Sequence, residues 1–124
     1  MTESKYDKGM KIRREVLGDE HVDRAEKNKT FLDGDFQDLI VEVAWGSVWS
    51  RPGLEREVRQ LITIAILAAS GNQHELEIHL RGAKNTGIPL EKIRETLMQV
   101  AGYGGIPSAN SAFAAAKKIF ADDL

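Results

Sequence analysis

The stretch LEREVRQLITIAILAASGNQHELEIHLRGAKNTG, residues 54–87, decides the fold. Its first half begins polar and becomes apolar nearly all round over residues 61–69, which predicts a buried central helix. Gly71 can end that helix, Asn72 can cap a second one, and Gly87 can end the second. The pattern therefore predicts an antiparallel helical hairpin at the centre of the protein.

Helical patterns also flank this hairpin, and no stretch alternates apolar and polar residues for long enough to predict a sheet. We therefore predict an all-α, single-domain bundle of about six to seven helices over residues 1–124, with residues 1–30 forming a peripheral helical arm. A third helix begins after Asp33 or Asp35, and its apolar residues recur at helical spacing, which predicts a stripe that faces the core. The stripe consists of Phe36, Leu39, Ile40 and Val43.

The charge balance excludes some classes of partner. The chain has 17 Lys and Arg against 19 Asp and Glu, a net charge of -2, and no basic run of the kind that follows a phosphate backbone. We expect no nucleic-acid partner. The longest apolar stretch, residues 61–69, is too short to cross a bilayer and the first residues lack an apolar signal core, so we expect no membrane partner and a cytoplasmic protein.

Cysteine is absent from the sequence. Disulfide bonds, thiolate metal sites and thiol-based catalysis are therefore excluded.

His79 is the residue most suggestive of chemistry. Glu75 lies one helical turn before it and can raise its pKa or fix its tautomer, while Gly82 and Ala83, one turn after it, leave space for a small ligand. The pair fits a proton-transfer site, although a half-buried histidine in a helical salt bridge gives the same spacing. We expect no metal site, because His74 and His79 are five residues apart and do not share a helix face.

Four further residues are candidates for substrate binding. Arg51 and Arg59 flank the start of the buried helix, where a guanidinium can hold a carboxylate bidentately. Trp45 can supply a rigid pocket wall, and Tyr103, beside a run of glycines, can supply a hydroxyl. The alternatives are surface ion pairs for the arginines and a core-edge position for the tyrosine.

Several sequence blocks together resemble the carboxymuconolactone decarboxylase branch of the alkyl hydroperoxidase D-like superfamily, and the likeness spans nearly the whole chain. The most specific blocks are YDKGMKIRREVLG (6–18), AWG (44–46), WSRPGL (49–54), LITIA (61–65) and HLRGA (79–83). The peroxidase branch of this superfamily uses a Cys-x-x-Cys pair followed three residues later by a histidine that matches His79. Its cysteine positions fall on Asn72 and Glu75, and its upstream glutamate falls on Gln60, so thiol peroxidase chemistry is impossible here.

The resemblance implies a cofactor-free decarboxylation of 4-carboxymuconolactone or a similar small lactone carboxylate. It also implies a homo-oligomer, with a hexamer expected. Residues such as Ile66 and Ile78 agree with self-association, because one small core cannot cover every apolar helix face. For the chemistry we assign proton delivery to His79, tuned by Glu75, carboxylate binding to Arg51 or Arg59, the pocket wall to Trp45 and oxyanion donation to Tyr103.

The chain departs from the family pattern beside the AWG block. Glu42 stands where related sequences tend to carry a basic residue, Val43 replaces a polar or aromatic residue, and Ser47 replaces an acid. A carboxylate close to a dianion site would repel the substrate. A related lactone or small-acid enzyme with another substrate, and a non-enzymatic oligomeric binding protein, are therefore the alternatives.

Overall fold

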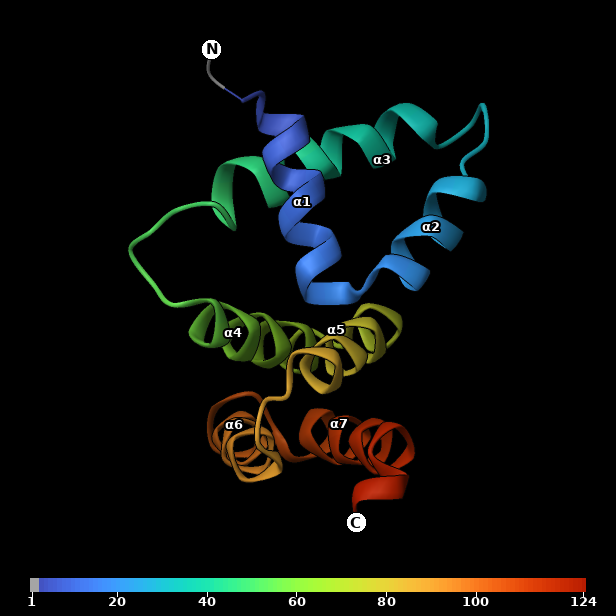
Figure 1. Cartoon of the computed structure of the whole chain (residues 1–124). Helices are drawn as coiled ribbons and strands as arrows, with labels where there is room; N and C mark the ends of the chain where they lie inside the picture. The colour runs from blue at the N-terminus through green and yellow to red at the C-terminus, as the bar shows by residue number, and fades with distance from the viewer. Residues whose placement is uncertain (1–2) are drawn as a thin grey trace. The chain divides into compact units, whose positions relative to one another are not determined.

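The computed structural model describes residues 3–124. Over this range the protein has seven α-helices, one π-helical segment and one 3-10 turn, and no strand, which confirms the predicted all-α class (Figure 1). The chain divides into two compact units, Met1–Glu55 and Arg56–Leu124. No helix of the described residues is both long and apolar enough to span a bilayer, and the cytoplasmic location stays a prediction.

The first unit contains three α-helices and the π-helical segment. They are α1 (Lys5–Leu17), α2 (Asp19–Lys27), α3 (Gly34–Ile40) and η1 (Val41–Val48). Helix α1 begins at a Ser4 cap, whose hydroxyl accepts a hydrogen bond from the backbone N–H of Asp7, and ends at Gly18 with φ 90°. A residue with a β-carbon would be strained at that φ, so the glycine ends the helix here.

Two glycines allow α1 and η1 to cross at backbone contact. A β-carbon added to Gly46 would overlap the carbonyl oxygen of Lys5 and lie 2.8 Å from its carbonyl carbon. A β-carbon added to Gly9 would overlap the carbonyl oxygen of Val41 and lie 2.7 Å from the nitrogen of Gly46. Because backbone atoms face both positions, no side-chain movement can make room for a larger residue.

The core of this first unit forms beside the glycine crossing. Ile12 and Val16 of α1 pack against Trp45 of η1, and all three are buried. The ring of Trp45 stacks on that of Trp49, with centroids 4.6 Å apart and planes inclined by 21°. Trp45 therefore lies inside a helix and in a core.

The predicted inward stripe of the third helix is wrong for three of its four residues, and only Ile40 packs against the core. Phe36, Leu39 and Val43 are each more than half exposed, whereas Val41 and Trp45 are buried. Phe36 and Leu39 belong to α3, in which no residue is buried. The π-helical geometry after Ile40, in which each turn takes in more residues than an α-turn, changes the inward positions from Val41 onward and so accounts for Val43.

A polar cluster away from the tryptophan core connects α1, α2 and α3 of the first unit. The ammonium of Lys29 lies 2.7 Å from a carboxylate oxygen of Glu26 and 2.6 Å from one of Asp38. Tyr6 donates its hydroxyl to Glu26 at 3.3 Å. Hydrogen bonds to the two carboxylates hold the pKa of Lys29 well above its usual value, so this side chain remains charged.

The second unit is a four-helix bundle with a short 3-10 turn after it. Its elements are α4 (Arg56–Ala69), α5 (Gln73–Thr86), α6 (Leu90–Tyr103), α7 (Ile106–Ile119) and η2 (Ala121–Asp123). Gln60, near the start of α4, bonds to Thr86 at the end of α5, so these helices run antiparallel as predicted. Ile64, Leu76, Leu80 and Leu97 are fully buried between the four helices.

Helix α4 is less buried than its sequence indicated. Ile64 and Ala68 face the core, but Ile62 and Ile66 are 43% and 60% exposed. The other three helices of this unit do not surround α4 on every side, so one face of α4 remains apolar and uncovered within the second unit.

Candidate active site

Helix α5 holds His79 in a fixed position. The helix starts after Asn72 and ends at Gly87, whose left-handed conformation (φ 78°) lets its N–H bond back to the carbonyls of Ala83 and Lys84. Leu76 and Leu80 are completely buried and determine which side of the helix faces the core. His79 follows at the edge of that buried face, which is the position expected from the sequence.

The imidazole of His79 lies in a partly buried environment. The residue is half-buried, and its Nδ1 atom is shielded from solvent. Gly82 and Ala83, one turn further along α5, are both buried and add at most a methyl group beside the ring. On this side of the ring the surroundings are therefore small and apolar, and a proton held by this histidine can be exchanged close to a low-dielectric surface.

Glu75 lies one turn before His79 on the same helix, but it is exposed. Within residues 3–124 its carboxylate makes no hydrogen bond or ion pair. The proposed tuning of His79 by Glu75 therefore stays a prediction that depends on a change of the glutamate rotamer.

Arg59 lies on the neighbouring helix of the same unit. It lies in the first turns of α4, is half-buried, and has its Nε atom shielded from solvent. The hydroxyl of Thr63 donates to the backbone carbonyl of Arg59 at 2.8 Å, one turn along the helix. Since α4 and α5 pack together, the second unit supplies both a guanidinium and an imidazole from adjacent helices.

One polar link between these two helices was not identified as functional from the sequence. Gln60 is only 2% exposed, and its side-chain amide donates to the hydroxyl of Thr86 at 3.0 Å. The Thr86 hydroxyl lies 3.2 Å from the carbonyl of Gly82 as well. The sequence signal for this link is a glutamine next to a long apolar run, because a buried side-chain amide needs a hydrogen-bond partner.

The other candidate residues lie elsewhere in the chain. Trp45 and Arg51 belong to the first unit, where Trp45 is a core residue and Arg51 is exposed. Tyr103 is the last residue of α6 and is 91% exposed. The structure places Arg59 and His79 on adjacent helices of one unit, and the roles assigned to all five residues remain predictions.

The residues that depart from the expected pattern all lie in η1. Glu42 and Val43 are exposed, and Ser47 is half-buried with its hydroxyl 3.4 Å from the carbonyl oxygen of Glu42. A carboxylate exposed to water exerts a screened field, which weakens the repulsion that its sequence position suggested.

The sequence has recognisable relatives. Residues 34–118 match the profile of the Carboxymuconolactone decarboxylase family. The 4-carboxymuconolactone decarboxylase of Acinetobacter baylyi is 42% identical over 120 residues, which are 97% of this chain and 90% of that protein. The nitrosuccinic acid decarboxylase of Metarhizium robertsii is 41% identical over 117 residues, 94% of this chain and 82% of that protein. A 4-carboxymuconolactone decarboxylase sequence of Pseudomonas putida is 48% identical over 42 residues, 34% of this chain and 88% of that sequence.

The fold and the site define a class of small, all-helical proteins in which an antiparallel hairpin carries a half-buried histidine. Within that class, the chain belongs to the carboxymuconolactone decarboxylase family, which confirms the resemblance seen in its sequence blocks. Its activity is of the carboxymuconolactone decarboxylase type, which makes it a carboxy-lyase. The match at residues 34–118 begins in the first unit and ends in the second, so both units contribute to the family's sequence pattern.

Proposed function

We propose that this protein decarboxylates 4-carboxymuconolactone or a closely similar small lactone carboxylate, giving 3-oxoadipate enol-lactone and carbon dioxide without a cofactor. The observation that carries the proposal is the 42% identity to the Acinetobacter baylyi enzyme, which extends over 97% of the chain.

The substrate itself supplies the electron sink for this reaction. The bond between the ring carbon and its carboxylate breaks, carbon dioxide leaves, and the electron pair passes into the unsaturated lactone to give a furanolate oxyanion. A proton added to carbon then completes the product. The protein has to hold the anionic substrate, stabilise the oxyanion and deliver that proton.

The residues of the hairpin can divide these tasks. His79 delivers the proton, because it is the half-buried titratable group beside Gly82 and Ala83. Arg59 binds a substrate carboxylate from α4, and Arg51, Trp45 and Tyr103 are the further candidates for carboxylate binding, the pocket wall and oxyanion donation. A guanidinium with a buried Nε holds a carboxylate more strongly than one in water does, because the surrounding dielectric is lower.

A second candidate is decarboxylation of a nitro-substituted dicarboxylic acid. It is favoured by the 41% identity to the nitrosuccinic acid decarboxylase of Metarhizium robertsii. A nitro group accepts the electron pair released with carbon dioxide as an unsaturated lactone does, so the same proton donor and carboxylate-binding residues serve both reactions. Glu42, Val43 and Ser47 depart from the lactone enzyme's pattern and leave this substrate open.

The test is an assay of the purified protein with each of the two substrates, following carbon dioxide release without added metal or nucleotide. We expect turnover of the lactone with a kcat/KM at least tenfold above that of nitrosuccinate. Turnover of nitrosuccinate alone would replace the first candidate with the second. A folded protein that turns over neither substrate would contradict both.

His79→Ala tests the assigned proton donor. We expect kcat to fall by about 100-fold or more, which is the usual contribution of a positioned general acid, while the melting temperature changes little. His74→Ala is the matched control, because His74 is an exposed histidine on the same helix. Activity that survives His79→Ala together with a large loss of stability would make His79 a structural residue.

We also propose that the protein assembles into a symmetric homo-oligomer, with a hexamer expected from its family. The support is the uncovered apolar face of α4, where Val58, Ile62 and Ile66 recur at intervals of four residues and are each more than a third exposed. Light scattering that gives a monomer at micromolar concentration would contradict this proposal.

A further inference from the structure

The connection between α2 and α3 exposes two large apolar side chains. Leu32 is 93% exposed and Phe31 is fully exposed. Neither side chain packs in the core of the first unit, so the fold of that unit does not explain why both are apolar. This connection is the cyan loop in Figure 1. We call Phe31 and Leu32 the apolar knob.

Hydrogen bonds hold the apolar knob in a defined shape. The carboxylate of Asp33 accepts the backbone N–H of Thr30 at 2.8 Å and its hydroxyl at 2.9 Å. The Thr30 hydroxyl accepts the backbone N–H of Leu32 at 3.2 Å, and the Thr30 carbonyl accepts the N–H of Gly34 at 2.8 Å. A turn fixed in this way presents its two apolar side chains to water without much freedom, which is the property of a preorganised interface anchor.

The second unit contains an apolar pocket that the proposed chemistry does not use. Its volume is about 300 Å³, and its apolar walls come from α6, α7 and the residues that follow α7. These walls include Ile93, Leu97, Phe113 and Phe120. We call it the α6–α7 pocket.

The size of the pocket matches the apolar knob. A cavity of about 150 Å³ lined by Leu, Ile and Phe side chains is large enough to bind benzene. The pocket has about twice that volume, enough for the ring of Phe31 and the branched side chain of Leu32 together.

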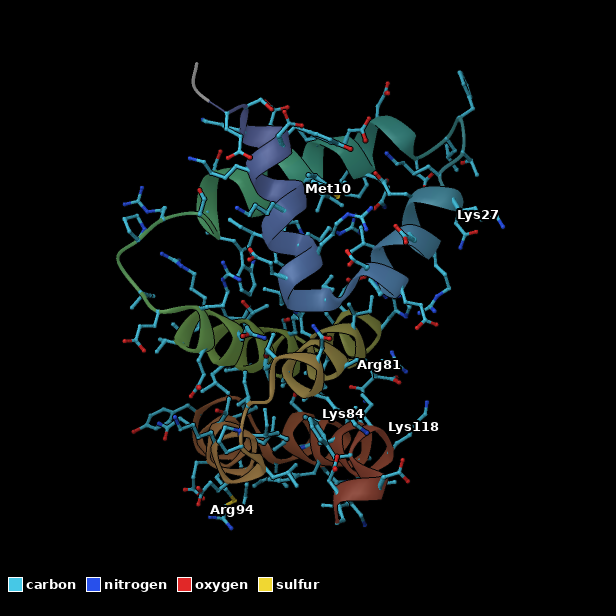
Figure 2. All side chains as sticks on the ribbon, in the orientation of Figure 1. Met10, Lys27, Arg81, Lys84, Arg94 and Lys118 are labelled. Atoms are coloured by element: carbon cyan, nitrogen blue, oxygen red, sulfur yellow. The ribbon has the colours of Figure 1, made fainter. Side chains whose placement is uncertain are left out.

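One charge beside each surface is complementary to a charge beside the other. Lys117 lines the pocket and Asp35 follows the apolar knob, and neither forms an ion pair within residues 3–124. The other charged residues at the pocket are Glu91 and Arg94, of which Arg94 pairs with Glu95 at 2.9 Å and extends from α6 (Figure 2). Lys117 is therefore the pocket cation available to an incoming carboxylate.

We infer that the apolar knob of one copy inserts into the α6–α7 pocket of a second copy, with Asp35 of the first facing Lys117 of the second. The inference rests on the self-association proposed above and specifies a contact within it. Such a contact joins two different patches, so it is either reciprocated between two copies or repeated around a closed ring.

The first test compares the concentration at which the full-length protein dissociates, measured by size-exclusion chromatography with light scattering. We expect the double variant Phe31→Ser, Leu32→Ser to raise the dissociation midpoint by about 30-fold or more, which is the usual effect of losing one interface anchor. Phe36→Ser is the matched control, because Phe36 is an exposed phenylalanine on α3 of the same unit. We expect it to shift the midpoint less than threefold.

The second test identifies the partner surface through its charge. Lys117→Glu should raise the midpoint several-fold, and adding Asp35→Lys should restore it to within about twofold of the wild-type value, because the ion pair is then reversed. Both residues are exposed, so these variants are expected to fold.

Each contrary outcome has a definite meaning. An unchanged midpoint in the double serine variant, an equal shift in Phe36→Ser, or additive charge variants without restoration would overturn the knob-in-pocket contact while leaving the oligomer intact. A monomeric wild-type protein would overturn both the contact and the proposed oligomer. Decarboxylation, measured separately, tests the proposed reaction independently of either result.

Discussion

The buried side chain of Gln60 on α4 donates its amide to the hydroxyl of Thr86 on α5 across 3.0 Å, joining the two helices that carry Arg59 and His79. The bond lies at the end of the hairpin opposite the turn at Gly71. The bond fixes the relative position of α4 and α5 at this end, because the amide must stay within hydrogen-bonding distance of the hydroxyl. Hydrophobic contacts alone would let one helix slide along the other.

Thr86→Val removes the hydroxyl but keeps the shape of the side chain, leaving the buried Gln60 amide without this partner. We expect the free energy of unfolding to fall by about 1 to 2 kcal/mol, measured by urea denaturation with far-UV circular dichroism. Gln99→Ala, at an exposed glutamine of α6, is the control and should change it by less than about 0.5 kcal/mol. Equal effects of the two substitutions would mean that the Gln60–Thr86 bond contributes nothing specific.

Gly46→Ala should disrupt the crossing of α1 and η1. The new methyl group would overlap backbone atoms of Lys5, which cannot move aside singly, so we expect a loss of about 3 kcal/mol or an unfolded first unit. Gly53→Ala is the control, because a β-carbon there meets nothing within 4 Å. Differential scanning calorimetry should show a lower melting temperature for the first variant alone, and tolerance of Gly46→Ala would mean that the two helices separate readily.

Glu42→Arg should have little effect on catalysis. The carboxylate is exposed in η1, so solvent and salt reduce its interaction with a bound anion to a few tenths of a kcal/mol. We expect kcat/KM for the lactone dicarboxylate to change by less than twofold. A gain of tenfold or more would instead place Glu42 at the substrate and favour a different natural substrate.

The Thr30–Asp33 turn should loosen in acid. Hydrogen bonds from the backbone N–H and hydroxyl of Thr30 lower the pKa of Asp33 below its ordinary value of 3.8. Since the folded pKa is depressed, the stabilisation is complete above pH 3.8 and is lost as the pH falls through the folded pKa. A pH titration of the Thr30 amide resonance by NMR should have its midpoint below 3.8, and Thr30→Val should move the midpoint upward. A wild-type midpoint at or above 3.8 would contradict the turn's hydrogen bonds.

The hairpin was predictable because its signals are local. A long apolar run followed by Gly71 and Asn72, and a terminal Gly87, specify two helices and their ends whatever surrounds them. The half-buried position of His79 was predictable for the same reason, since the residues one turn away on the same helix lie beside its ring. The predicted contact with Glu75 depends on a rotamer, which helical spacing does not determine.

The first unit was harder to predict because its decisive features join distant residues. Gly9 and Gly46 look like ordinary helix-weakening residues in the sequence, and only their pairing across the crossing explains them. The π-helical turns after Ile40 also change which residues face inward, so an α-helical period assigned the wrong face to Val43. Interhelical packing decides both features, and a single sequence carries no direct record of it.

The stacked pair of Trp45 and Trp49 makes tryptophan fluorescence a probe of one unit of this protein. These are both of the chain's tryptophans, and both belong to Met1–Glu55, whereas His79 and Arg59 belong to Arg56–Leu124. Indole fluorescence therefore reports the melting of the first unit alone, while far-UV circular dichroism sums the helices of both. Coincidence of the two melting curves would establish that the units unfold as one cooperative body, and a separation between the curves would measure their independence without any label.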